Sequence, residues 1–146
     1  MHKLKHGSFF CFHGSSLENW YSIMRNGLRN LSNTALMTAG AAYGSGIYAS
    51  ANFMTSYGYT TRYNAGERIW KHSIESLKST LNYIIGIVEI INKKIYEKSG
   101  DRNIVVVTDE DDIIIRYLLV IKTACAASYP QLNQFKTQDI KFDDHY

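Results

Sequence analysis

The chain has 146 residues, of which 45% are hydrophobic and 20% charged, and these proportions are typical of one globular domain. Its net charge is +3 and its lysines and arginines form no run of five or six, so the electrostatic footprint of a dedicated nucleic-acid binder is missing. No stretch is apolar for long enough to form a transmembrane helix and no secretory leader opens the chain, so we expect a single intracellular domain over residues 1–146, in the cytoplasm or the nucleus.

The first predicted unit is a strand, a loop and a helix. Ser8–Phe12 is an aromatic run that predicts a short buried strand, which ends at a polar His-Gly-Ser-Ser stretch. Leu17–Asn26 repeats apolar residues at helical spacing and therefore predicts a helix. We expect Ser15 or Ser16 to cap its start and Gly27 to end it in the left-handed conformation.

The middle of the chain has fewer regular signals. Asn30–Gly40 predicts a loop, and Tyr43–Tyr48 places glycines beside tyrosines, a pattern that lets the backbone approach a neighbour or a ligand closely. Ala51–Tyr59 predicts a short helix with Ser50 as its cap, and the polar stretch Thr61–Asn82 predicts a further helical segment.

The second half of the chain reads as strands. Tyr83–Ile91, Ile104–Val107 and Ile113–Ile121 are rich in isoleucine and valine, and the acidic turn Thr108–Asp112 separates the last two. Helices therefore precede most of the strands, and this order predicts an α+β fold.

Three segments carry motifs that indicate a function only when they are considered together. Alone, a His-Gly-Ser at the end of a strand is usually a polar turn, and a tyrosine in an apolar strand is usually part of the core. Their order and spacing here resemble the poly(ADP-ribose) polymerase (PARP) family of ADP-ribosyltransferases, with Gly40–Gly44 most similar to the mono-ADP-ribosylating members. The resemblance follows Phe10–Ser15, Asn19, Asn26–Arg29, Ala42–Tyr48, Ser56, Tyr59, Gly86–Ile90 and Arg116–Val120.

The resemblance implies an ADP-ribosyltransferase fold, with a split, antiparallel-rich β-sandwich core and flanking helices, and NAD⁺ as the co-substrate without a metal. It gives His13 and Tyr48 catalytic positions, with the His13 imidazole on a ribose hydroxyl. The backbone of Gly14 and the hydroxyl of Ser56 would bind the nicotinamide carboxamide, and the rings of Tyr48 and Tyr59 would hold the nicotinamide ring. The other implied NAD⁺-binding residues, mostly on the adenosine and phosphate side, are Ser15, Asn19, Arg29 and Gly46.

One position departs from the chain-forming members of the family. Those enzymes carry a glutamate at the start of the strand before the Tyr-Leu-Leu strand, and the matching residue here is Ile104. Isoleucine can neither accept a hydrogen bond nor act as a base, so a His-Tyr-Ile triad implies transfer of a single ADP-ribose. A register slip of one residue would substitute Asn103 or Val105, neither of which is a carboxylate, and only a slip of three would reach Asp101.

Several other polar residues have structural interpretations that we prefer. We expect Glu89 at a sheet edge or on a sheet surface and Asp109–Asp112 in a solvated turn that lacks the spacing of a calcium loop. The remaining expectations are surface positions for His72 and His145, helix-face core positions for Trp20 and Trp70, and buried thiols for Cys11 and Cys125.

Two hypotheses of different classes follow. In the first, the chain is an enzyme that transfers mono-ADP-ribose from NAD⁺ to an unidentified acceptor protein, with the chain itself among the candidates; a nucleic-acid end is the less favoured acceptor. In the second, it is an inactive module that binds NAD⁺, ADP-ribose or a partner protein. Loss of His13 or Tyr48 would have indicated the second, and both residues are present.

Overall fold

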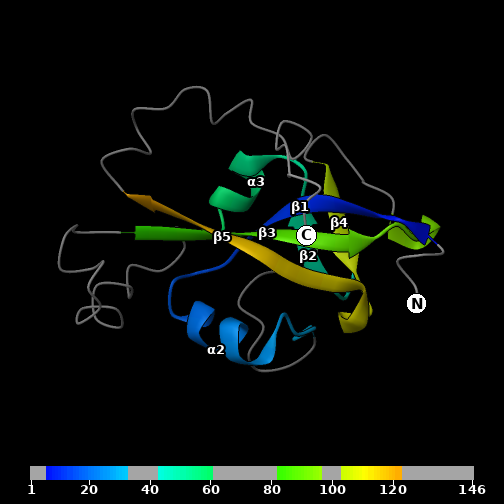
Figure 1. The fold of residues 1–146 in the computed structure, drawn as a ribbon, viewed down its shortest axis with the longest axis horizontal. Coiled ribbons are helices and arrows are strands. Elements are labelled where there is room, and N and C mark those ends of the chain that lie inside the picture. The colour runs from blue at the N-terminus through cyan, green and yellow to red at the C-terminus, as the bar shows by residue number, and fades with distance from the viewer. Residues whose placement is uncertain (1–5, 33–42, 61–81, 97–102, 123–146) are drawn as a thin grey trace, which may run out of the picture.

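The computed structural model describes residues 6–32, 43–60, 82–96 and 103–122 (Figure 1). The strands are β1 (Ser8–Gly14), β2 (Ile47–Ser50), β3 (Asn82–Ile91), β4 (Ile104–Val107) and β5 (Ile113–Lys122). The α-helices are α2 (Asn19–Asn26) and α3 (Phe53–Tyr57), and two short 3₁₀ helices are η1 (Lys94–Tyr96) and η2 (Glu110–Asp112). No helix in the described ranges is long and apolar enough to cross a membrane.

The described strands form one antiparallel sheet in the order β4-β2-β1-β3-β5, with α2 and α3 on opposite faces (Figure 1). This arrangement confirms the predicted α+β class. β1 pairs with β3 from Ser8 to Gly14 but pairs with β2 at a single position, Phe12 opposite Ser50. The two halves of the sheet therefore separate just beyond Phe12, at the end of β1.

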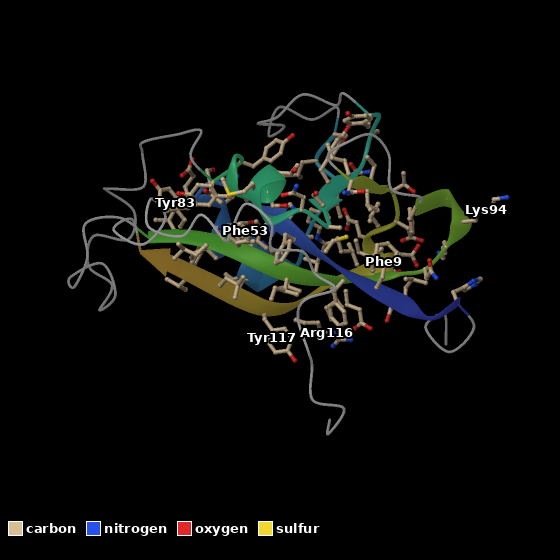
Figure 2. All side chains as sticks on the ribbon, turned by 90° about the horizontal axis from the view of Figure 1, so that it is seen from above. Phe9, Phe53, Tyr83, Lys94, Arg116 and Tyr117 are labelled. Atoms are coloured by element: carbon tan, nitrogen blue, oxygen red, sulfur yellow. The ribbon has the colours of Figure 1, made fainter. Side chains whose placement is uncertain are left out.

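Alternation along the strands produces a core on each face of the sheet. On one face, Cys11 and Val88 pack with Leu28, which follows α2, and with Tyr96 of η1. On the other face, Phe12, Ile85 and Ile87 pack with Phe53 of α3, which lies over the sheet in Figure 2. The rings of Phe12 and Phe53 meet edge to face, with centroids 5.5 Å apart. Cys11 is buried as expected, whereas Cys125 lies outside the described residues.

Helix α2 begins differently from the prediction. It starts at Asn19 rather than Leu17, and its N-cap residue is Glu18, which has helical dihedrals and makes no side-chain cap hydrogen bond. The predicted Ser15 or Ser16 cap is therefore wrong; Ser15 instead accepts a hydrogen bond from the Asn19 side chain, 3.0 Å away. Gly27 does end the helix with a positive φ of 77°, and its ψ of −179° belongs to a region that only glycine populates.

Helix α3 is capped by Asn52 and not by Ser50. The Asn52 side chain accepts a hydrogen bond from the Met54 N–H at 2.9 Å, and its backbone is extended, as an N-cap requires. Ser50 is still the last residue of β2, so its hydroxyl accepts from the Asn52 N–H at 3.0 Å and shapes the turn before the helix. The helical segment predicted over Thr61–Asn82 lies outside the described residues except for Asn82, which opens β3.

The strands predicted in the second half are confirmed, but two of their acidic residues are not where we expected them. Glu89 lies in β3, between β1 and β5, and is 4% exposed. Its carboxylate accepts from Arg116 at 2.7 Å and from the Ser8 hydroxyl, so the predicted edge or surface position is wrong. The reason is that β3 is an internal strand, so Glu89 lies at no edge, and the cation that pairs with it is Arg116, the extra residue at a bulge in β5.

The acidic turn is also less solvated than predicted. Asp112 is 3% exposed, and its carboxylate accepts hydrogen bonds from Lys93 and from the Tyr96 hydroxyl. This contact stabilises the charged lysine and raises the pKa of Lys93. Only part of the turn, including the exposed Asp111, is the solvated surface that the sequence suggested. Trp70, His72 and His145 lie outside the described residues.

Candidate active site

His13 lies where β1 separates from β2. Its Nδ1 is 2.8 Å from the carbonyl oxygen of Tyr48, so the imidazole bridges the two strands beyond their last backbone pair. A carbonyl oxygen can only accept, and Nδ1 therefore carries the proton. In the neutral ring Nε2 is left as an acceptor. Burial lowers the pKa of His13, an effect larger than the opposing one of the hydrogen bond to Tyr48, so the ring is neutral at pH 7.

The imidazole of His13 also contacts the ring of Trp20. The two rings meet edge to face with centroids 6.1 Å apart, and the indole N–H of Trp20 donates to the Ser15 carbonyl at 3.1 Å. A Cβ on Gly86, which pairs with His13 across the sheet, would lie 3.0 Å from the Trp20 ring. Trp20 is fully buried as predicted, and it also fixes the surroundings of His13, which the sequence did not indicate.

Gly14 and Ser56 lie against each other. A Cβ on Gly14 would lie 1.7 Å from the Ser56 carbonyl oxygen, so glycine is required for α3 to pack on the end of β1. The buried hydroxyl of Ser56 donates to the Phe12 carbonyl at 2.8 Å. We expected glycine here for the approach of a ligand, and the structure adds a packing requirement. Tyr59 follows the helix, and its N–H donates to the Ser56 carbonyl at 3.1 Å.

The Tyr48 side chain is tied to the loop that precedes β2. Its hydroxyl donates to the Gly44 carbonyl at 2.6 Å and accepts from the Tyr43 N–H at 2.9 Å. Gly46, in the same loop, lies so close to β4 that a Cβ would be 2.6 Å from a methyl carbon of Val106 and 2.8 Å from the Val107 carbonyl oxygen. The two hydrogen bonds of its hydroxyl tie the phenol ring of Tyr48 to this loop.

The remaining predicted residues form two groups. Ser15 and Asn19 are bonded to each other next to His13, at the start of α2. Arg29 lies apart, with its guanidinium paired to the carboxylate of Glu110 in η2, and no described contact joins it directly to His13. Ile104 opens β4, as the sequence predicted, is 4% exposed, and pairs with Ser50 of β2.

The described site thus has no carboxylate at the start of β4. His13, Gly14, Tyr48 and Ser56 are brought together by direct contact, while Tyr59, Ser15 and Asn19 adjoin them through short hydrogen-bonded links. Sequence reasoning missed Glu110, which lies 81 positions from its partner Arg29 and is read locally only as part of an acidic turn. In the described ranges no group of three or more His, Cys, Asp or Glu side chains could hold a metal ion.

The sequence of the chain is similar to those of known proteins. The model of a family described as the poly(ADP-ribose) polymerase catalytic domain matches residues 2–98. Over 54 residues the chain is 59% identical to the protein mono-ADP-ribosyltransferase PARP8 of Mus musculus, and equally to that of Homo sapiens. The match covers 37% of this chain and only 6% of each relative.

Proposed function

This chain belongs to the poly(ADP-ribose) polymerase catalytic-domain family, and on that basis we propose that it is an NAD⁺-dependent mono-ADP-ribosyltransferase. Domains of this family use NAD⁺ as a substrate. In the proposed reaction the bond between nicotinamide and ribose breaks, and its electron pair leaves with neutral nicotinamide. A nucleophile on a protein side chain forms the new bond to the ribose carbon and loses its proton.

The observation that carries this proposal is the contact of His13, Gly14, Tyr48 and Ser56, which come from two strands and a helix and meet where β1 and β2 separate. Cleavage of NAD⁺ places positive charge on the ribose and requires little proton transfer, so the enzyme must mainly orient its substrate. Groups whose positions are each fixed by a packing or hydrogen-bonding contact are suited to that task.

We assign the nicotinamide end of NAD⁺ to the Gly14 backbone, the Ser56 hydroxyl and the rings of Tyr48 and Tyr59. Stacking of the pyridinium on tyrosine contributes about 0.5–2 kcal/mol. The Ser56 hydroxyl has one proton, which it donates to the Phe12 carbonyl, so it must rotate to donate to the carboxamide.

The ribose and the adenosine side are assigned to other residues. Nε2 of His13 would accept a hydrogen bond from a ribose hydroxyl, since Nδ1 is committed to Tyr48. The adenosine and phosphate side is assigned to Ser15, Asn19 and Arg29, and Gly46 is a further NAD⁺-binding residue of the proposed site.

Ile104 supports transfer of a single ADP-ribose. An apolar residue at the start of β4 cannot activate the hydroxyl of a growing polymer, and the name of the PARP8 relatives, mono-ADP-ribosyltransferase, favours the same product. The acceptor is a protein side chain, in preference to a nucleic-acid end. The same absence of a carboxylate supports the second candidate function, an NAD⁺- or ADP-ribose-binding module without turnover.

Incubation with labelled NAD⁺ distinguishes the transferase from the binding module. We expect the wild-type chain to release nicotinamide and to label protein, and His13→Ala and Tyr48→Ala to lower both by at least about tenfold through lost orientation. Matched controls are His6→Ala and Tyr21→Ala, since Tyr21 is 60% exposed on α2. NAD⁺ binding without any turnover would favour the module, and a ladder of polymer products would refute single transfer.

A further inference from the structure

Glu110 lies at the centre of contacts that fix the segment after α2. One carboxylate oxygen accepts from the Arg29 guanidinium, and the other accepts from the Asn30 N–H at 2.7 Å. The carboxylate is ionised, because these two hydrogen bonds lower the pKa of Glu110. Glu110 therefore joins two consecutive residues after α2 to the turn between β4 and β5.

The same segment is bonded at its other end to the loop before β2. The Asn30 side chain accepts from the Ser32 N–H at 3.2 Å, and the Ser32 hydroxyl accepts from the Gly46 N–H at 2.9 Å. Gly46 leads directly into β2, whose Tyr48 carbonyl accepts from His13. A continuous series of hydrogen bonds and short backbone links thus connects Glu110 with the strands that carry the nicotinamide-side residues.

We infer that Glu110 is a positioning residue, which holds the Arg29 guanidinium at the phosphate and adenosine side of the NAD⁺ site without itself contacting the substrate. The inference rests on the proposed function and adds to it a residue from a different part of the chain.

The geometry of the pair favours positioning over competition with the substrate. The salt bridge uses a single nitrogen of Arg29, Nη1, and a single oxygen of Glu110. A guanidinium has five N–H donors in a rigid fork, so most of them stay available to a phosphate. The Arg29 side chain is 58% exposed, whereas Glu110 is 34% exposed and has its second oxygen on the backbone of Asn30. The arginine thus loses conformational freedom before the ligand arrives, which reduces the entropic cost of binding.

The test compares binding of three compounds by calorimetry: NAD⁺, ADP-ribose, and nicotinamide, which has no phosphate. Glu110→Gln removes the charge but leaves a carbonyl oxygen that can still accept from the Asn30 N–H. We expect it to weaken ADP-ribose and NAD⁺ binding by about three- to fivefold, the effect of losing an exposed ion pair, and to leave nicotinamide binding unchanged. Asp111→Asn, an identical charge change at the exposed neighbouring residue, is the control and leaves all three affinities unchanged.

A double-mutant cycle with Arg29→Ala shows whether Glu110 acts through the arginine. Once Arg29 is absent, Glu110→Gln is expected to have no further effect on ADP-ribose binding. The inference is overturned if Glu110→Gln tightens ADP-ribose binding, weakens nicotinamide binding equally, matches Asp111→Asn, or has its full effect without Arg29. A wild-type chain that binds none of the three compounds would instead refute the proposed function, and the inference with it.

Discussion

The two ring nitrogens of His13 have different tasks. Nδ1 donates to the Tyr48 carbonyl, and this bond both joins β1 to β2 and decides which tautomer the ring adopts. Burial keeps the ring uncharged near neutral pH, since it disfavours the imidazolium more than the carbonyl favours it. An uncharged ring suits the proposed site, because Nε2 must accept from a ribose hydroxyl, and protonation would turn this acceptor into a donor.

The lowered pKa of His13 predicts how stability and NAD⁺ binding depend on pH. In the unfolded chain the imidazole titrates near its ordinary pKa of 6.5, and in the folded chain it titrates lower. Below pH 6.5 the unfolded state therefore binds a proton that the folded state does not, so this residue lowers the free energy of unfolding as the pH falls through 6.5 toward the folded pKa. NAD⁺ affinity stays constant down to that lower pKa and then falls.

Urea unfolding at a series of pH values from 8 to 5, with NAD⁺ binding measured in parallel, checks this. His13→Gln is expected to lose less stability below pH 6.5 than the wild-type chain, and His6→Gln to follow the wild type. An equal acid dependence in His13→Gln would show that this ring is not the group responsible.

Some contacts of single residues could not be predicted from the local sequence. The strand and loop around His13 follow from an aromatic run that ends in a polar stretch, and the structure bears these elements out. The contact of Trp20 with His13 and Gly86 and the pairing of Arg29 with Glu110 depend on which strands are neighbours in the sheet. A one-dimensional pattern does not contain that information. The sequence therefore indicated only that Trp20 is a core aromatic residue and that Glu110 is an acidic residue in a turn.

At the scale of elements, periodicity located the strands well and the helix starts poorly. β3, β4 and β5 lie where runs of isoleucine and valine predicted them. β1 continues through His13 and Gly14, which pair with Gly86 and Ile85, and that partner strand lies far away in the sequence. The helix caps were misjudged because serine can act either as a cap or in a turn, and its neighbours in space decide which.

Because α3 packs on the end of β1, we predict that an alanine at Gly14 destabilises the fold far more than an alanine at Gly58. In Gly14→Ala the new methyl would lie 1.7 Å from the Ser56 carbonyl oxygen, so the helix must move away from the strand. We expect a loss of about 3 kcal/mol in the free energy of unfolding and a loss of nicotinamide binding, since the Ser56 hydroxyl moves with the helix.

Gly58, the C-cap residue two positions after Ser56, is the matched control. Its φ is −58°, and an added Cβ would meet its neighbours at 3.6 Å, an ordinary contact. Gly58→Ala is therefore expected to change stability by less than about 1 kcal/mol, and to increase it if the restricted unfolded chain dominates. Urea denaturation measures the free energy of unfolding of both variants, and equal losses would show that the contact of Gly14 with Ser56 is not what limits the residue at position 14.

At the scale of the whole molecule, the sheet order explains why the site forms where it does. β1 is central in the described sheet, with β3 paired along its whole length on one side and β2 attached at one position on the other. The end of β1 is thus rigid toward β3 and separated from β2, so the side chains of β1, β2 and α3 can meet there. β4 lies beyond β2, which places Ile104 opposite Ser50 and on the same strand pair as Tyr48.

This placement of Ile104 yields a prediction about the product. Ile104 is 4% exposed, so Ile104→Glu would bury a carboxylate in an apolar position opposite Ser50. We expect a loss of about 3 kcal/mol in the free energy of unfolding, and products that still carry one ADP-ribose. Ile104→Gln introduces a side chain of the same size as glutamate but without its charge. It should therefore be less destabilised than Ile104→Glu. Ile104→Val, expected to cost about 1 kcal/mol, keeps the apolar surface and single transfer.

Urea unfolding reports the stability, and gel analysis of labelled products reports chain length. Polymer from Ile104→Glu would mean that this one position limits the product. If Ile104→Glu were as stable as the wild type, the start of β4 would accommodate a charge. Burial would then not explain why a carboxylate is missing at this position.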